Sequence, residues 1–268
     1  MLITKPIQNI VFFDIETIPA SEFFFSLSLR KQELFLKKFK KEAEELLKLP
    51  MDDWSVDILK DDVELRPKLE KFYNNRAALQ AEFNQVVAIS IGWFEAPTPL
   101  PEGWPGDQPL KFRTKSFSGT DEKQLLINFY AGMKSILDKT MNPTHHLCGH
   151  NIFMFDIPVL AKRFIINKLP LPAMLDVENK KEWNLPWLID TRVAWKLTSF
   201  DGGCSLDLLC EVLGVDSSKS VMSGAEVRDT YYIEKDIKKI AVYCTADIVA
   251  LAECYIRMKS MSNPIVVA

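Results

Sequence analysis

The sequence is poor in cysteine, and its cysteines are not arranged for cross-linking. They are odd in number and none forms a CxxC pair, which argues against a disulfide framework and against a thiolate zinc site. A reducing cytoplasm is therefore the compartment we expect. The five residues are Cys148, Cys204, Cys210, Cys244 and Cys254.

Long apolar runs are also absent. No stretch approaches the roughly 20 residues that cross a bilayer. The opening residues carry one lysine and a short apolar run, IVFF, which Asp14 interrupts. The sequence thus predicts neither a membrane span nor a secretion signal.

Positive charge is not in excess, because the chain has 33 lysines and arginines and 36 acidic residues, which gives a net charge of −3. A broad basic surface that binds duplex nucleic acid without specificity is therefore not expected. A nuclease is not excluded, since catalytic carboxylates make such an enzyme more acidic and require only a local basic rim. The length of 268 residues and the 47% hydrophobic content allow a core on both faces of a sheet.

Short apolar runs alternate with amphipathic stretches, which is typical of an α/β protein. A buried strand over Ile10–Phe13 is expected to close at Asp14 and to be broken by Thr17–Ala20. Strands at 85–94 and 111–117, joined by a loop at 96–109, predict a hairpin. The other expected elements are a brief strand at 147–149 and helices at 28–49, 65–82, 121–137, 157–168, 206–213 and 236–258. Together they predict a mixed sheet flanked by helices.

Asp14 and Glu16 are the first candidates for a metal site. They stand two positions apart at a strand end, so their side chains project from the same face. Their hard oxygen atoms suit Mg²⁺ or Mn²⁺ better than zinc. Taken alone, the pair is also compatible with a solvated strand end.

Asn151 and Asp156 form a second candidate group, in the segment HNIFMFDIPVL that starts at His150. Each also has a purely structural interpretation. Asn151 is a common turn residue, and Asp156 would serve as the N-cap of the following helix. Their spacing after a short strand nevertheless favours a shared role.

Tyr243 and Asp247 form a third group, four residues apart within the helix expected at 236–258. This spacing places both on one helical face. A half-buried core tyrosine and a surface aspartate are the structural alternative. Because Asp247 has apolar neighbours in the sequence, its carboxylate needs a partner, and a metal ion would supply one.

In this order the three segments resemble the motifs of the DEDD exonucleases: FDIETIP at 13–19, HNIFMFDIPVL at 150–160 and YCTAD at 243–247. Tyr243 resembles the tyrosine subgroup (DEDDy), because the histidine subgroup would have histidine at the position of Val242. The likeness is to predicted 3′-5′ exonucleases related to the proofreading domain of family B DNA polymerases. Asp190 in WLIDTR and the segments at 205–214 and 223–227 resemble the same group.

This resemblance implies a ribonuclease-H-like fold and two divalent cations, Mg²⁺ or Mn²⁺. Asp14 would bridge the two cations, Glu16 and Asp247 would hold the one that carries the attacking water, and Asp156 would hold the other. Tyr243 would position that water, with proton removal as a secondary role. The terminal nucleotide would be held by Asn151 and by the backbone around Thr17.

The resemblance leaves a helical insertion at about 21–83 unexplained, within what we expect to be a single exonuclease domain over 1–268. Its basic residues would suit a strand-binding groove, although a run of lysines mixed with glutamates is more typical of a solvated face. These residues are Arg30, Lys31, Lys37, Lys38, Lys40 and Lys41.

The expected partner is the 3′ end of a single strand, DNA rather than RNA, with a 5′-mononucleotide as the product. An exoribonuclease or oligoribonuclease and a non-catalytic single-strand-binding module remain the alternatives. The motifs do not separate ribose from deoxyribose, because that discrimination depends on contacts with the 2′-hydroxyl. Any polymerase or repair partner is expected to be a separate chain.

Overall fold

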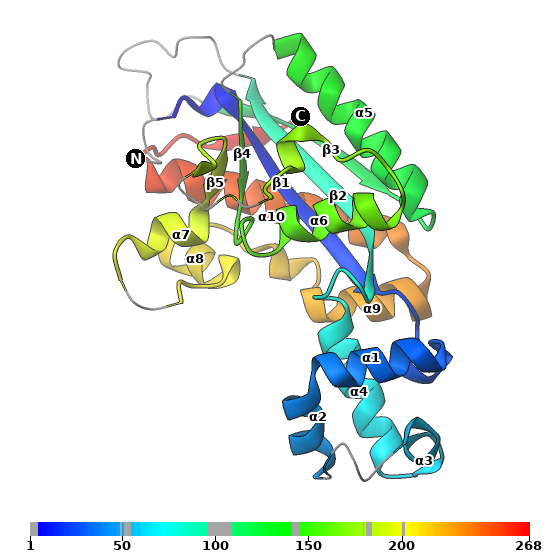
Figure 1. Ribbon diagram of the computed structural model, residues 1–268. Coiled ribbons are helices and arrows are strands. Elements are labelled where there is room, and N and C mark those ends of the chain that lie inside the picture. Colours follow the sequence, from blue (N-terminus) through cyan, green and yellow to red (C-terminus); the bar gives the residue numbers. More distant parts are fainter. Residues whose placement is uncertain are drawn as a thin grey trace. The chain divides into compact units, whose positions relative to one another are not determined.

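The computed structural model describes residues 5–48, 50, 55–95, 109–140, 145–178, 180, 184–199 and 202–268, and only the backbone of 137–140 (Figure 1). Within them a six-stranded sheet has the order β5-β4-β1-β2-β3-β6. The strands are β1 (Ile10–Pro19), β2 (Asn84–Glu95), β3 (Leu110–Ser118), β4 (His146–Gly149), β5 (Leu188–Asp190) and β6 (Ile265–Val267).

The sheet is mixed. β1 pairs in parallel with β4, and β4 pairs in parallel with β5. β2 and β3 pair antiparallel from Ala88 opposite Ser118 to Glu95 opposite Lys111, which confirms the expected hairpin. Apart from its last residue, Pro109, the loop expected at 96–109 lies outside the described residues. The α/β fold class, a mixed sheet flanked by helices, is confirmed, and its ribonuclease-H-like character stays a prediction.

Helices cover both faces of the sheet, with α10 on one side and α5 and α6 on the other (Figure 1). The expected helices at 121–137, 157–168, 206–213 and 236–258 are all present. The helices that accompany the sheet are α5 (Glu122–Thr140), α6 (Asp156–Ile166), α7 (Thr191–Lys196), α8 (Leu206–Leu213), α9 (Val227–Asp229) and α10 (Ile237–Met258), with a π-helical turn at Thr230–Glu234.

Neighbouring residues of β1 pack on opposite faces of the sheet. The ring of Phe12 lies 5.6 Å from that of Tyr255 on α10, whereas the ring of Phe13 lies 5.8 Å from that of Phe129 on α5. Both phenylalanines are fully buried, and each such side chain contributes about 1.5–3 kcal/mol of transfer free energy. This alternation directs the even-numbered residues of β1 toward α10.

β1 is longer than expected. The sequence predicts its end at Asp14 and a break over Thr17–Ala20, but the strand continues to Pro19. The expected end at Asp14 is wrong because polar residues on the α10 side of the strand do not interrupt its backbone pairing, whereas the expected end of pairing at Pro19 is confirmed. Pro19, which lacks a ladder donor, is its last residue.

Residues 17–85 form a compact unit separate from the one made of 1–16 and 86–268, and its limits nearly match the expected insertion. Its helices are α1 (Leu29–Lys38), α2 (Lys40–Leu47), α3 (Val56–Asp61) and α4 (Leu65–Ala77). They surround a core of their own that includes Phe24, Phe35, Leu69 and Tyr73. Whether 1–268 acts as a single domain stays a prediction.

Two helix predictions in this unit are wrong in detail. The single helix expected at 28–49 is two helices, because the chain bends at Phe39, whose ring packs 4.9 Å from that of Phe35. The helix expected at 65–82 ends at Ala77, and α3, which Ser55 caps, precedes it. Of the six basic residues named above, Arg30, Lys38 and Lys40 form ion pairs with glutamates of the same unit, which favours the solvated face.

None of the helices among the described residues has the length and apolar character needed to cross a membrane. All five cysteines are free.

Candidate active site

The carboxylates of Asp14 and Glu16 project from the same face of β1. This is the face on which Phe12 packs against α10. Asp14 is tied to that helix by Cys244, whose thiol lies 3.5 Å from both the backbone oxygen and Oδ2 of Asp14. Glu16 is buried. The solvated strand end, the structural alternative for this pair, is therefore wrong.

Tyr243 and Asp247 enter the same place from α10. The helix begins after Asp236, whose side chain accepts a hydrogen bond from the backbone N–H of Lys239. One turn separates Tyr243 from Asp247, and their side chains are hydrogen-bonded. Asp247 is only 8% exposed, so it is not the surface charge of the structural alternative.

Asp14, Glu16 and Asp247 form a compact group. One carboxylate oxygen from each lies within 4.8 Å of the others. Burial, followed by repulsion from neighbouring carboxylates, raises the pKa values of Asp14 and Glu16 well above their usual range. Burial also raises the pKa of Asp247, against the opposing effect of a 2.5 Å hydrogen bond from Ser218 Oγ. A divalent cation would relieve this repulsion.

Asp156 lies beside this group but outside it. It is the first residue of α6, and the N-cap position belongs to Phe155, so the N-cap interpretation is wrong. The backbone N–H of Ile15 hydrogen-bonds its carboxylate, while burial raises its pKa to about 7. Its charge also contributes to raising the pKa values of Asp14 and Glu16. The structure thus places Asp156 next to β1, and its role as a metal ligand stays a prediction.

Asn151 is a turn residue, as its structural interpretation proposed, with a φ of 71°. Its side-chain oxygen accepts a hydrogen bond of 3.2 Å from Arg192 Nη1. Thr17 belongs to the 17–85 unit, where its hydroxyl donates to the backbone oxygen of Ala78 at 2.7 Å. Nucleotide binding by Asn151 and Thr17 stays a prediction.

The sequence reasoning missed Lys219 and Ser218. Lys219 Nζ donates a 2.7 Å hydrogen bond to the hydroxyl oxygen of Tyr243, and its charge acts on Glu16 and Asp247. Both missed residues lie in a short 3-10 turn, Ser218–Ser220. Such a turn has no hydrophobic periodicity, and only the fold brings it to α10.

The donor chemistry of the site fits the expected cations. Exonuclease domains of this kind use divalent metals, and within the described part of the chain the group that could hold one consists of carboxylates alone. Anionic oxygen atoms are the ligands that Mg²⁺ and Mn²⁺ prefer. Asp14, Glu16 and Asp247 would hold such an ion, with Asp156 beside them.

Comparison with known proteins gives two matches. A family described as predicted 3′-5′ exonucleases related to the exonuclease domain of PolB matches residues 77–266, so the match includes Asp156, Tyr243 and Asp247 and begins after Asp14 and Glu16. The family B DNA polymerase of the hyperthermophilic archaeon Pyrobaculum calidifontis is 14% identical, with a TM-score of 0.46, over 94% of this chain and 24% of the polymerase.

The likeness to the polymerase is too distant to add to the assignment, and this chain spans only a small part of that protein's length. No curated protein matches the chain. The family match extends over more than half of the chain and contains most of the site described above. The chain therefore belongs to the family of predicted 3′-5′ exonucleases related to the exonuclease domain of PolB, and it is a hydrolase.

Proposed function

We propose that this protein is a metal-dependent exonuclease that removes 5′-mononucleotides from the 3′ end of single-stranded DNA. The observation that carries the proposal is the compact group of Asp14, Glu16 and Asp247, with Tyr243 hydrogen-bonded to Asp247. Asp14, Glu16, Asp247 and Asp156 would hold two cations, Mg²⁺ or Mn²⁺. Such ions, when bound, activate water and neutralise charge on the leaving oxygen.

Tyr243 acts first as a hydrogen-bond donor. Burial, and then the charges of Asp247, Glu16 and Asp14, raise the pKa of its hydroxyl above the usual value. The phenol therefore stays protonated at neutral pH and is able to orient the attacking water or a phosphate oxygen. This supports positioning as the primary role, with proton removal secondary.

Lys219 supplies a positive charge beside the carboxylates. Its ammonium group lies 5.1 Å from the centroid of the Tyr243 ring. In this place the charge would offset that of a phosphate entering next to several acidic groups. The chain has a net charge of −3 and would repel an anionic substrate. A local positive charge at Lys219 would reduce this repulsion at the scissile phosphate.

DNA is the proposed substrate because the family is related to the exonuclease domain of PolB. The partner would be a 3′ end, and a separate polymerase or repair chain would supply it in the cytoplasm. RNA remains the second candidate substrate, since discrimination depends on contacts with the 2′-hydroxyl. A binding module without catalysis has no need for a compact group of three carboxylates with a fourth, Asp156, beside it.

The experiment that tests the proposal uses 5′-labelled DNA and RNA strands of the same sequence. Wild type, Asp14→Ala and Asp57→Ala are compared in Mg²⁺, Mn²⁺ or chelator, and Asp57 is the control because it is exposed on α3. We expect a ladder that shortens from the 3′ end with wild type and Asp57→Ala, faster on DNA, and no ladder with Asp14→Ala or chelator. Affinity for the strand without any product in Mn²⁺ would instead indicate a binding module.

A further inference from the structure

Asp190, the last residue of β5, has a buried carboxylate that serves two segments at once. It is 1% exposed. Oδ1 accepts hydrogen bonds from the backbone N–H groups of Arg192 at 2.9 Å and Val193 at 3.4 Å, which makes Asp190 the N-cap of α7. Capping alone would not require the remaining lone pairs of the carboxylate.

The remaining bonds of Asp190 go to the turn between β4 and α6. Oδ1 accepts from the backbone N–H of Asn151 at 2.9 Å, and Oδ2 accepts from that of Phe153 at 3.3 Å. The parallel register of β4 and β5, which pairs Gly149 with Asp190, brings this carboxylate to the start of the turn. The two segments are about 40 residues apart in the sequence, so only the sheet joins them.

The turn that Asp190 holds determines where α6 begins. Asn151 has a positive φ of 71°, a conformation that is unfavourable for most residues with a side chain. Its backbone oxygen accepts hydrogen bonds from the N–H groups of Met154 and Phe155, at 3.1 and 3.0 Å. The next residue, Asp156, is the first of α6. Fixing Asn151 and Phe153 therefore fixes the path of the chain into Asp156.

The two residues after Asp190 strengthen the same connection. His150 Nδ1 lies 2.9 Å from the hydroxyl oxygen of Thr191, and Arg192 Nη1 donates to the side-chain oxygen of Asn151. Asp190 at the end of β5 and the first two residues of α7 thus contact the turn. Such repeated contact holds a turn in one conformation better than a single bond does.

We propose that Asp190 is a positioning residue of the exonuclease site, which sets Asn151 and Asp156 in place through two backbone hydrogen bonds from the turn before α6, without touching the substrate. This inference rests on the proposed function. Asparagine is the informative replacement, because it caps helices as well as aspartate does. Its NH₂ group, however, would face a backbone N–H of the turn and leave it without an acceptor.

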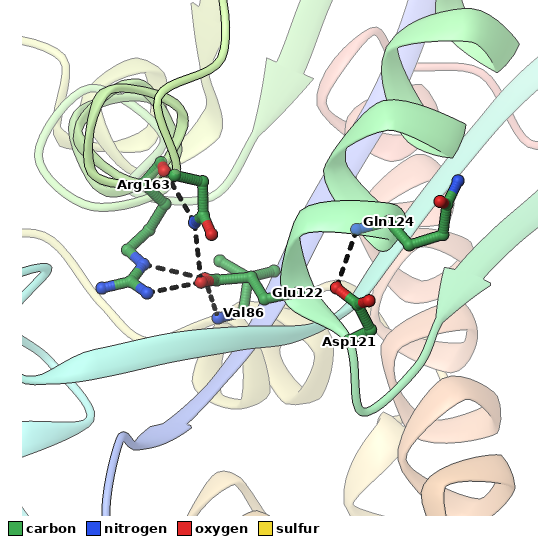
Figure 2. Close-up of polar contacts among 6 residues, drawn as sticks. Val86, Asp121, Glu122, Gln124 and Arg163 are labelled. Carbon is green, nitrogen blue, oxygen red and sulfur yellow. Dashed lines mark hydrogen bonds and ion pairs between the residues drawn. The ribbon is translucent and has the colours of Figure 1, made fainter.

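The experiment compares Asp190→Asn with Asp121→Asn in the full chain. Asp121 is a matched control, because it accepts a backbone N–H only at the start of α5, from Gln124 at 3.0 Å (Figure 2). Asp190→Ser is measured beside them, since its single oxygen caps α7 but does not replace the acceptors of the turn. Amounts of folded protein are equalised by circular dichroism.

Two readouts are taken: kcat and KM on a labelled strand, and a Mn²⁺ titration followed by electron paramagnetic resonance without any substrate. With Asp190→Asn we expect kcat to fall about tenfold or more and one Mn²⁺ to bind at least about tenfold more weakly, as occurs when groups that orient metal ligands are replaced. The other Mn²⁺, held by Asp14, Glu16 and Asp247, should bind as in wild type. Asp121→Asn should match wild type in both readouts.

Unchanged kcat and an unchanged Mn²⁺ isotherm in Asp190→Asn would overturn the proposal, as would equal losses in Asp121→Asn. If Asp190→Asn does not fold, Asp190→Ser decides by the same criteria. If wild type shows no exonuclease activity but loses one Mn²⁺ on Asp190→Asn substitution, the proposed function fails while the positioning role of Asp190 stands.

Discussion

Lys219 and Tyr243 are joined by a hydrogen bond of 2.7 Å, with the ammonium group of Lys219 as the donor to the phenol oxygen. This bond leaves the phenol O–H directed elsewhere, and Asp247 accepts it in the absence of substrate. Lys219 therefore orients the tyrosine as well as adding charge to the site.

We predict that Lys219→Met lowers kcat by about 100-fold or more, because a positioned donor and its charge contribute on that scale. Tyr243→Phe should lower kcat by a similar factor. Since the two side chains act as a unit, the double variant should be little worse than either single variant. Rates of single-strand shortening in Mg²⁺ measure this coupling.

Lys238→Met is the control for the lysine, because Lys238 is exposed on α10 and should keep wild-type rates. Multiplicative losses in the double variant would show that Lys219 and Tyr243 act independently, against this interpretation.

The pH dependence of stability should be inverted at this site in metal-free protein. Burial raises the pKa of Asp156 to about 7, from an ordinary value of 3.8. Between these values the folded protein keeps a proton that the unfolded chain has released. Stability therefore falls as pH rises through this window and levels off above about pH 7.

Thermal unfolding in chelator, at pH values from about 4 to about 8, measures this effect. Asp156→Asn is the reference, because it lacks the titrating group while the histidines and the other carboxylates remain. The melting temperature of wild type should fall relative to that of Asp156→Asn as pH rises. A constant difference between the two would contradict the prediction.

Metal binding should release protons from the site. Asp14, Glu16 and Asp247 have raised pKa values, and coordination requires their ionised forms. We therefore expect Mn²⁺ to acidify a weakly buffered solution near neutral pH and to raise the melting temperature. At 100 times its dissociation constant an ion adds about 2.7 kcal/mol. Asp14→Ala should lose most of both effects.

Glu122 and Arg163 form a buried ion pair away from the proposed site (Figure 2). The carboxylate also accepts hydrogen bonds from the backbone N–H of Val86 at 2.7 Å and from Asn167 at 2.8 Å. We predict that Glu122→Gln destabilises the protein by about 3–5 kcal/mol, because it leaves the guanidinium buried without its charge partner. Guanidinium-induced unfolding measures the change.

Glu95→Gln is the matched control. Glu95 pairs with Arg113 at 2.6 Å, but its side chain is 41% exposed, and exposed pairs contribute about 0–1 kcal/mol. Similar losses in Glu95→Gln and Glu122→Gln would mean that burial does not determine the effect.

The sequence was sufficient for the parts of the site that follow local rules. Period-two alternation placed Asp14 and Glu16 on one face of a strand, and the four-residue spacing placed Tyr243 above Asp247 on a helix. The hairpin and the helices at 121–137 and 236–258 were predicted for the same reason. In each case the pattern was long enough to show its period.

The missed features depend on contacts between distant segments. β5 and β6 have three residues each, too few to show alternation. Lys219 meets Tyr243 across 24 residues, and Asp190 meets Asn151 across 39. No helical or strand period relates residues so far apart in the sequence. The contacts that Lys219 and Asp190 make around the carboxylates therefore depend on the tertiary fold.

The insertion begins and ends at nearly the same point. The backbone N–H of Ala20 donates to the backbone oxygen of Phe83 at 2.8 Å, so the chain leaves and returns through adjacent positions, and the residues between them have a core of their own. Closing so short a gap requires only a tight turn. We therefore expect the segment between Ala20 and Phe83 to be replaceable as a unit. This segment could be shortened, exchanged or replaced by a reporter sequence with little effect on β1 and β2.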